Sequence, residues 1–131
     1  MPSINFFFPY KHISLRQRNR LKDFIRETFK KKKKKLISLN YIFCSDTELL
    51  EINRQFLKHD FFTDIITFNL SDTGEVEGEI YISAERVKEN ARLLHTTITE
   101  ELHRVIFHGI LHLCGYRDKS KKEKSKMRKQ E

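Results

Sequence analysis

The sequence contains no long hydrophobic run, only two cysteines and no tryptophan. No apolar segment approaches the ~20 residues that a helix needs to cross a membrane, so we expect no membrane span. The first 18 residues lack the basic start, the long apolar middle and the small-residue cleavage site of a secretory signal. Cys44 and Cys114 are too few for a disulfide framework, and reduced thiols in a cytoplasmic protein are the simplest interpretation.

The chain does contain enough apolar bulk for one hydrophobic core. It has 131 residues, of which 38% are hydrophobic, and eleven phenylalanines supply much of the volume. This length is typical of one domain. Because no internal repeat or linker interrupts the sequence, we expect a single domain over residues 1–131, with a basic tail from about residue 119.

Positive charge is concentrated in two segments. The formal net charge is +8, and the segments 30–35 and 119–131 together hold more than this excess, so the remainder is slightly acidic. Such runs suit a nucleic-acid backbone, where each neutralised phosphate releases counterions. The alternative interpretation is that the runs are solvated segments that aid solubility. The candidate nucleic-acid contacts are Lys30, Lys31, Lys32, Lys33, Lys34 and Lys35.

The hydrophobic pattern predicts an α+β fold. The predicted strands are residues 4–8, 36–44, 64–70 and 79–83, and the predicted helices are residues 15–29, 46–56, 84–94 and a last one that runs to about residue 113. Ser45 or Asp46 and Ser83 stand where N-caps belong, and Thr97 with Glu100 predicts a capping box. This order favours one compact domain with a mixed sheet of about four strands, whose last two strands form a hairpin, and helices packed against it.

The segment FHGILHLCGYRDK, residues 107–119, carries the pattern of a metal site. His108 and His112 are four residues apart and therefore share one face of a helix. Gly115 is suited to ending that helix, and Asp118 can present a third ligand from the returning chain. Three protein ligands leave one position open for water, as in catalytic zinc sites. We therefore predict one zinc ion per chain on the last long helix and the following turn, although another first-row divalent ion is possible.

The same spacing occurs in zinc proteases, which raises a second interpretation. Their pattern places a glutamate, the general base, directly after the first histidine. Here that position is Gly109, which has no side chain to accept a proton. A zincin-like metalloprotease is therefore disfavoured, whereas phosphodiester cleavage does not require that carboxylate.

HGILHLCGYRD resembles the His-Gly-x-Leu-His-Leu-x-Gly-Tyr-Asp-His signature of the YbeY family of bacterial rRNA-maturation endoribonucleases. The upstream segment ELLEINRQFLKHDFFTDIITFNL and the strand GEIYIS are similar to further segments of that family, and the likeness spans residues 49–118. The positions in register upstream are Asn53, Phe56, Asp60, Thr63, Asp64 and Phe68. The resemblance implies a zinc-dependent, single-strand-specific endoribonuclease that acts in small-subunit rRNA three-prime maturation and ribosome quality control. It also implies a cytoplasmic protein with rRNA and the ribosome or a ribosomal subunit as partners.

Two positions depart from the family pattern. Asp118 stands where the family has its third histidine, and aspartate is a competent zinc ligand. Leu57 stands where the family has an arginine, and its side chain has no charge to offer a phosphate. Arg117, Lys58 or His59 are candidates to supply that contact, although each can equally be a solvated surface side chain.

We therefore predict an endoribonuclease in which a zinc-bound water acts as nucleophile or base. The alternatives are a non-catalytic, zinc-stabilised ribosome-assembly factor, and a metallohydrolase of small substrates. Attack by water and attack by the ribose hydroxyl of the RNA both remain open, and the sequence predicts no oligomeric state. An open groove beside the metal distinguishes a nuclease from an assembly factor.

Overall fold

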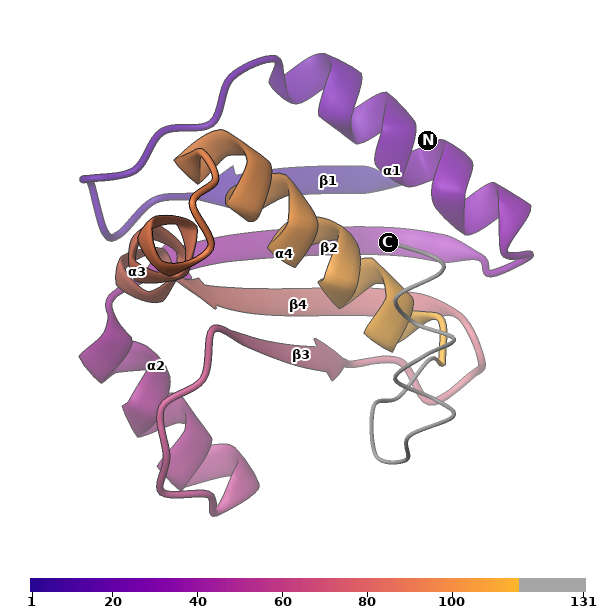
Figure 1. Ribbon diagram of the computed structural model, residues 1–131. Coiled ribbons are helices and arrows are strands. Elements are labelled where there is room, and N and C mark those ends of the chain that lie inside the picture. The colour runs from indigo at the N-terminus through magenta and orange to yellow at the C-terminus, as the bar shows by residue number, and fades with distance from the viewer. Residues whose placement is uncertain (116–131) are drawn as a thin grey trace.

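A computed structural model describes residues 1–115 and shows one mixed sheet with helices packed against it (Figure 1). The elements in chain order are β1 (Ser3–Phe7), α1 (Arg18–Lys31), β2 (Leu36–Cys44), α2 (Asp46–Ile52), the π-helical turn η1 (Asn53–Leu57), β3 (Ile65–Asn69), β4 (Val76–Ser83), α3 (Ala84–Leu93) and α4 (Ile98–Leu113). The predicted α+β fold is confirmed. The predicted basic tail lies outside the described residues.

The four strands are ordered β1-β2-β4-β3. β1, β2 and β4 run parallel to one another, and β3 pairs antiparallel with β4. The predicted hairpin is thus confirmed, and Gly74, at φ 85°, lies in the turn that connects its strands. The parallel pairs require helical crossovers, which α1 provides between β1 and β2.

The alternation of side chains along the strands gives the sheet two apolar faces. Tyr41 and Phe43 of β2 and Ile80 of β4 belong to the main core, which α1, α3 and α4 cover. Cys44 of β2 and Ile66 of β3 belong to a smaller cluster on the other face, which α2 covers. Figure 1 shows α4 crossing in front of β2 and β4, so the last helix lies over the centre of the sheet.

The predicted helix starts are largely correct. The Ser45 hydroxyl oxygen caps α2 by accepting a hydrogen bond from the Glu48 N–H, and the Glu48 carboxylate accepts one from the Ser45 N–H, which forms a complete capping box. Ser83 and Thr97 cap α3 and α4 through side-chain oxygens. At α4 only half of the predicted box forms, because the Glu100 carboxylate accepts its bond from the Thr96 hydroxyl instead.

The first helix begins later than the sequence pattern indicates. Residue 15 is buried in an extended segment, and α1 starts only at Arg18 because Gln17 adopts a left-handed conformation, with φ 54°. The helix also continues two residues further than predicted, to Lys31. Two lysines in its last turn complement the negative end of the helix dipole, which allows the helix to extend into the lysine run.

Both cysteines are free thiols in the interior. Burial raises the pKa of Cys44 to about 12 and also raises the pKa of Cys114. Both side chains therefore remain protonated at neutral pH and serve as packing residues. Among the described residues, no helix is both long enough and apolar enough to span a membrane.

Candidate functional site

His108 and His112 lie one turn apart on α4, as the sequence predicts. Their ring centroids are 4.6 Å apart, and the rings are nearly perpendicular, at 75°. Both side chains are half-buried, so each is held by its surroundings while still reaching solvent. At this separation one ring nitrogen from each histidine can reach the same metal ion, because zinc–nitrogen bonds are about 2.0–2.1 Å long.

Gly109 explains how α4 brings these histidines close to the sheet. A Cβ atom at this position would lie 2.9 Å from the Cδ1 atoms of both Ile65 and Ile80, closer than normal packing allows. The helix backbone therefore approaches β3 and β4 directly. Zinc proteases have a glutamate at this position, but here a side chain would collide with β3 and β4. The protease interpretation therefore fails for a structural reason as well as for lack of the general base.

A cavity of about 240 Å³ opens beside His112. Its walls come from η1, the loop that follows it, β3 and α4, and they are formed by Asn53, Leu57, His59, Phe61, Thr63, Ile65, Ile66, Thr67 and His112. The lining combines aromatic rings, aliphatic side chains, two hydroxyl groups and an amide. None of the lining residues within 1–115 is a carboxylate, so the described part of the lining does not repel an anionic ligand.

The buried Asn53 fixes the loop that forms one wall of this cavity. Its side chain is 1% exposed, and its amide donates a hydrogen bond to the Phe61 carbonyl over 2.9 Å. Its own carbonyl accepts a hydrogen bond from the His59 N–H over 3.1 Å. Asn53 therefore shapes the turn that follows it, as asparagines often do. Its two hydrogen bonds set the positions of His59 and Phe61.

The structure separates the predicted phosphate contacts. His59 lines the cavity together with His112, whereas the exposed Lys58, at φ 55°, is not part of its wall. Leu57 lines the cavity, so the position at which the resemblance places an arginine does lie at the site. Among residues 1–115, no lysine or arginine lines this cavity, and Arg117 lies outside the described residues.

The metal ligands are described only in part. Within residues 1–115, no three histidine, cysteine, aspartate or glutamate side chains are placed to hold a metal together. Asp118, the predicted third ligand, lies outside the described residues. The described pair nevertheless fits zinc, because the two imidazoles lie one helical turn apart and one of them, His112, borders a cavity with room for a further ligand.

Arg104 links the histidine face of α4 to the loop that precedes β3. It lies one turn before His108 and makes two hydrogen bonds of 2.8 Å to the carboxylate of Glu101, which is 1% exposed. The same guanidinium lies 3.7 Å from an Asp64 oxygen. This network, which the sequence reasoning did not find, ties the segment around Thr63 and Asp64 to the helix that carries the histidines.

The lysine run lies near the C-terminal end of α4. The positive charges of Lys32 and Lys34 act on the Cys114 thiol and lower its pKa against the larger effect of burial. Lys33 and Lys34 are exposed, whereas Lys35 forms an ion pair of 3.1 Å with Glu75. Figure 1 shows α1 and α4 ending at the same side of the molecule, which places the run at the end of α4 that carries His112.

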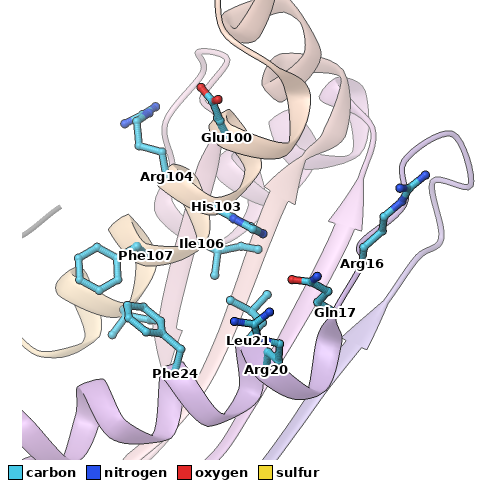
Figure 2. Close-up of a pocket in the computed structure, with 11 residues that line it drawn as sticks. Arg16, Gln17, Arg20, Leu21, Phe24, Glu100, His103, Arg104, Ile106 and Phe107 are labelled. Carbon is cyan, nitrogen blue, oxygen red and sulfur yellow. The ribbon is translucent and has the colours of Figure 1, made fainter.

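A larger cavity, of about 530 Å³, lies elsewhere, between α1 and α4 (Figure 2). Its lining includes the aromatic rings of Phe24 and Phe107, whose centroids are 5.8 Å apart. Arginine side chains and His103 surround this apolar floor, but neither His108 nor His112 contributes to it. Size alone therefore does not identify the candidate site, which is the smaller cavity beside His112.

Comparisons with known proteins identify the relatives of this chain. The profile of the family described as endoribonuclease YbeY matches residues 9–131. A protein named endoribonuclease YbeY from Cytophaga hutchinsonii is 52% identical, over 98% of this chain and 91% of its own length. A protein of the same name from Porphyromonas gingivalis is 42% identical over 98% of this chain and 85% of its own length. A solution structure from Thermotoga maritima covers 99% of this chain and 86% of its own, with a TM-score of 0.57 and 34% identity.

Proposed function

The chain belongs to the endoribonuclease YbeY family, and we propose that it cleaves single-stranded RNA with one zinc ion held by His108, His112 and Asp118. Its class, a hydrolase that cuts RNA internally, follows from the family. The observation that carries the metal-dependent mechanism is the histidine pair on α4, of which His112 lines a cavity with no carboxylate among its lining residues within 1–115. An RNA phosphate can approach these histidines without passing a carboxylate among the lining residues.

The residues around the cavity have separable roles in this proposal. When bound, zinc supplies a Lewis acid that polarises the phosphoryl group and favours an ionised nucleophile. His108 and His112 hold the ion through one ring nitrogen each. Thr63 and Thr67 offer hydroxyl groups for hydrogen bonds to the sugar or phosphate.

For the biological role, we propose small-subunit rRNA maturation and ribosome quality control in the cytoplasm. Family membership supports RNA as the substrate, and the exposed lysines at the His112 end of α4 provide a basic surface for a larger RNA. One observation favours the alternative of a non-catalytic assembly factor. Leu57 occupies the arginine position, so the described lining offers the phosphate no cation.

Incubating the zinc-loaded protein with end-labelled RNA tests the nuclease proposal directly. We expect a single-stranded RNA to be cut at internal positions and the same strand in a perfect duplex to survive. A chelator should abolish cleavage, and added zinc should restore it. RNA that is bound but never cut, at any zinc concentration, would instead establish the assembly-factor function.

The lysine run is expected to contribute to RNA affinity through counterion release. For single strands each phosphate contact adds about 0.7 to the slope of log affinity against log salt, so the double variant Lys33→Gln/Lys34→Gln should lower that slope by up to about 1.4. The charge-matched control is Lys11→Gln/Lys88→Gln, whose lysines lie near Tyr10, away from the run. RNA binding measured at several salt concentrations checks this, and equal slopes for both variants would make the run a solubility feature.

A further inference from the structure

Exposed hydrophobic side chains gather in the segment 56–62, which runs past the candidate cavity. Their exposed fractions are 62% for Phe56, 40% for Leu57, 54% for Phe61 and 54% for Phe62. Single exposed apolar residues are common on protein surfaces, but a group of this kind marks a binding surface. None of these four side chains belongs to the main hydrophobic core, which other residues form.

Within this segment, His59 and Phe61 form a stacked aromatic pair. Their ring centroids are 5.1 Å apart, and the rings are inclined by only 21°. The other two phenylalanines are engaged elsewhere: Phe56 packs edge-on against Phe68, and the ring of Phe62 lies 5.7 Å from the Arg86 guanidinium carbon. The pair is thus the part of the segment that presents parallel aromatic surface.

Hydrogen bonds from the preceding turn η1 hold the stacked pair in place. Asn53 receives the His59 N–H on its carbonyl and donates its side-chain amide to the Phe61 carbonyl, so one buried residue fixes both backbones. Arg54 binds the intervening Asp60. Because these contacts come from the protein's own residues, they fix the loop in the conformation that a flat group would meet, which lowers the entropy cost of binding.

Both rings also line the cavity that contains His112. A ligand stacked on the pair therefore has its next chemical group directed into the site of the histidines. The polar side-chain groups in this lining are the hydroxyls of Thr63 and Thr67, the amide of Asn53 and the imidazoles of His59 and His112, and none of the lining residues within 1–115 is a carboxylate. This combination of aromatic surface, hydroxyl groups and imidazoles fits a nucleobase with its attached phosphate better than it fits an acidic or an extended apolar peptide.

We propose that His59 and Phe61 stack on one unpaired base of the RNA and thereby position the adjacent phosphate at His112. This inference rests on the proposed function and explains its preference for single strands. A base inside a duplex has both faces covered by its neighbours, so it cannot stack on a protein ring unless it leaves the helix. The pair acts in positioning, and the chemistry remains with the metal ligands.

Replacing Phe61 with leucine removes the ring while keeping an apolar side chain of similar bulk. Stacking contributes about 1–3 kcal/mol per base, so the affinity for single-stranded RNA should fall about 5- to 150-fold. Phe61→Tyr should retain parental affinity because it keeps the ring. The matched control is Phe24→Leu, since Phe24 has the same exposed fraction of 54% but lines the other cavity.

A set of RNAs that each lack one base tests stacking itself. The parent protein should lose affinity when the base is missing at one particular position, and Phe61→Leu should lose nothing further there, because the interaction is already gone. The fluorescence of 2-aminopurine placed at that position should be quenched by the parent protein and by Phe61→Tyr, but not by Phe61→Leu.

Equal RNA affinity for Phe61→Leu and the parent, with cleavage intact, would overturn the stacking proposal and assign these rings to a protein partner. A parent protein that neither binds nor cuts RNA would overturn the proposed function as well.

Discussion

Replacing His112 with alanine is expected to remove zinc and RNA cleavage together. Its ring lies 4.6 Å from that of His108, centroid to centroid, and within residues 1–115 no third histidine, cysteine or carboxylate is placed to complete a metal site with them, so no described neighbour can take its place. Substitutions of residues that merely support a ligand cost about 10- to 100-fold in metal affinity or activity, and loss of the ligand itself should cost at least about 100-fold. Zinc content by mass spectrometry of metals and single-turnover cleavage of a single-stranded RNA measure the two losses.

His103→Ala is the matched control for this variant. His103 lies on the same helix, is exposed, and borders the larger cavity between α1 and α4 (Figure 2). It should keep both zinc and activity. Both substitutions should change the free energy of unfolding by less than about 1 kcal/mol, since neither removes a fully buried side chain. A metal-free His112→Ala protein that cuts RNA at the parental rate would contradict the metal mechanism.

The fold was predictable from the sequence because its elements carry local signals. Alternating apolar residues identify β2, with the bounds Leu36–Cys44 that the structure shows, and the oxygen side chains of Ser45, Ser83 and Thr97 mark three helix starts. The start of α1 was wrong because apolar spacing continues upstream to Leu15, while the left-handed backbone at Gln17 breaks the helix. Glutamine carries no strong sequence signal for that conformation.

The histidine pair was equally predictable, since residues four apart must share a helix face. The cavity beside it was not, because it depends on contacts between distant segments. Asn53 shapes the 58–64 loop through its buried amide, and Gly109 allows α4 to approach β3. From the sequence alone, Asn53 cannot be distinguished from any other turn-forming asparagine. Gly109 indicates only that the general base of zinc proteases is missing. The one local signal that the sequence reasoning passed over is the pair Phe61–Phe62 in an otherwise polar loop.

The site is divided between two kinds of segment, and this division has a physical reason. Metal ligands require fixed spacing, and a helix packed on the sheet supplies it through His108 and His112. The proposed substrate contacts come instead from the loop between η1 and β3, where His59, Phe61 and Thr63 line the cavity that also includes His112. Loops carry binding residues more often than packed helices do, because they tolerate changes in sequence.

The third ligand gives the last prediction. Asp118→Ala should lower zinc affinity and RNA cleavage in parallel, by at least about 10- to 100-fold, because two imidazoles alone hold the ion less firmly than three ligands. Asp118→His should keep the metal and substantial activity, since imidazole is an equally good zinc ligand. Metal titration and cleavage of the same single-stranded RNA should be measured on both variants.

Asp72→Ala is the control for the lost charge, because Asp72 is an exposed aspartate in the turn between β3 and β4. It should behave as the parent protein does. If Asp118→Ala retained full zinc affinity and full activity, Asp118 would not be the third ligand. If both Asp118 variants lost zinc equally, the position would require a carboxylate specifically, and the equivalence with the histidine of the family signature would be wrong. If Asp118 is a metal ligand, Asp118→His should retain zinc and activity, whereas Asp118→Ala should lose both.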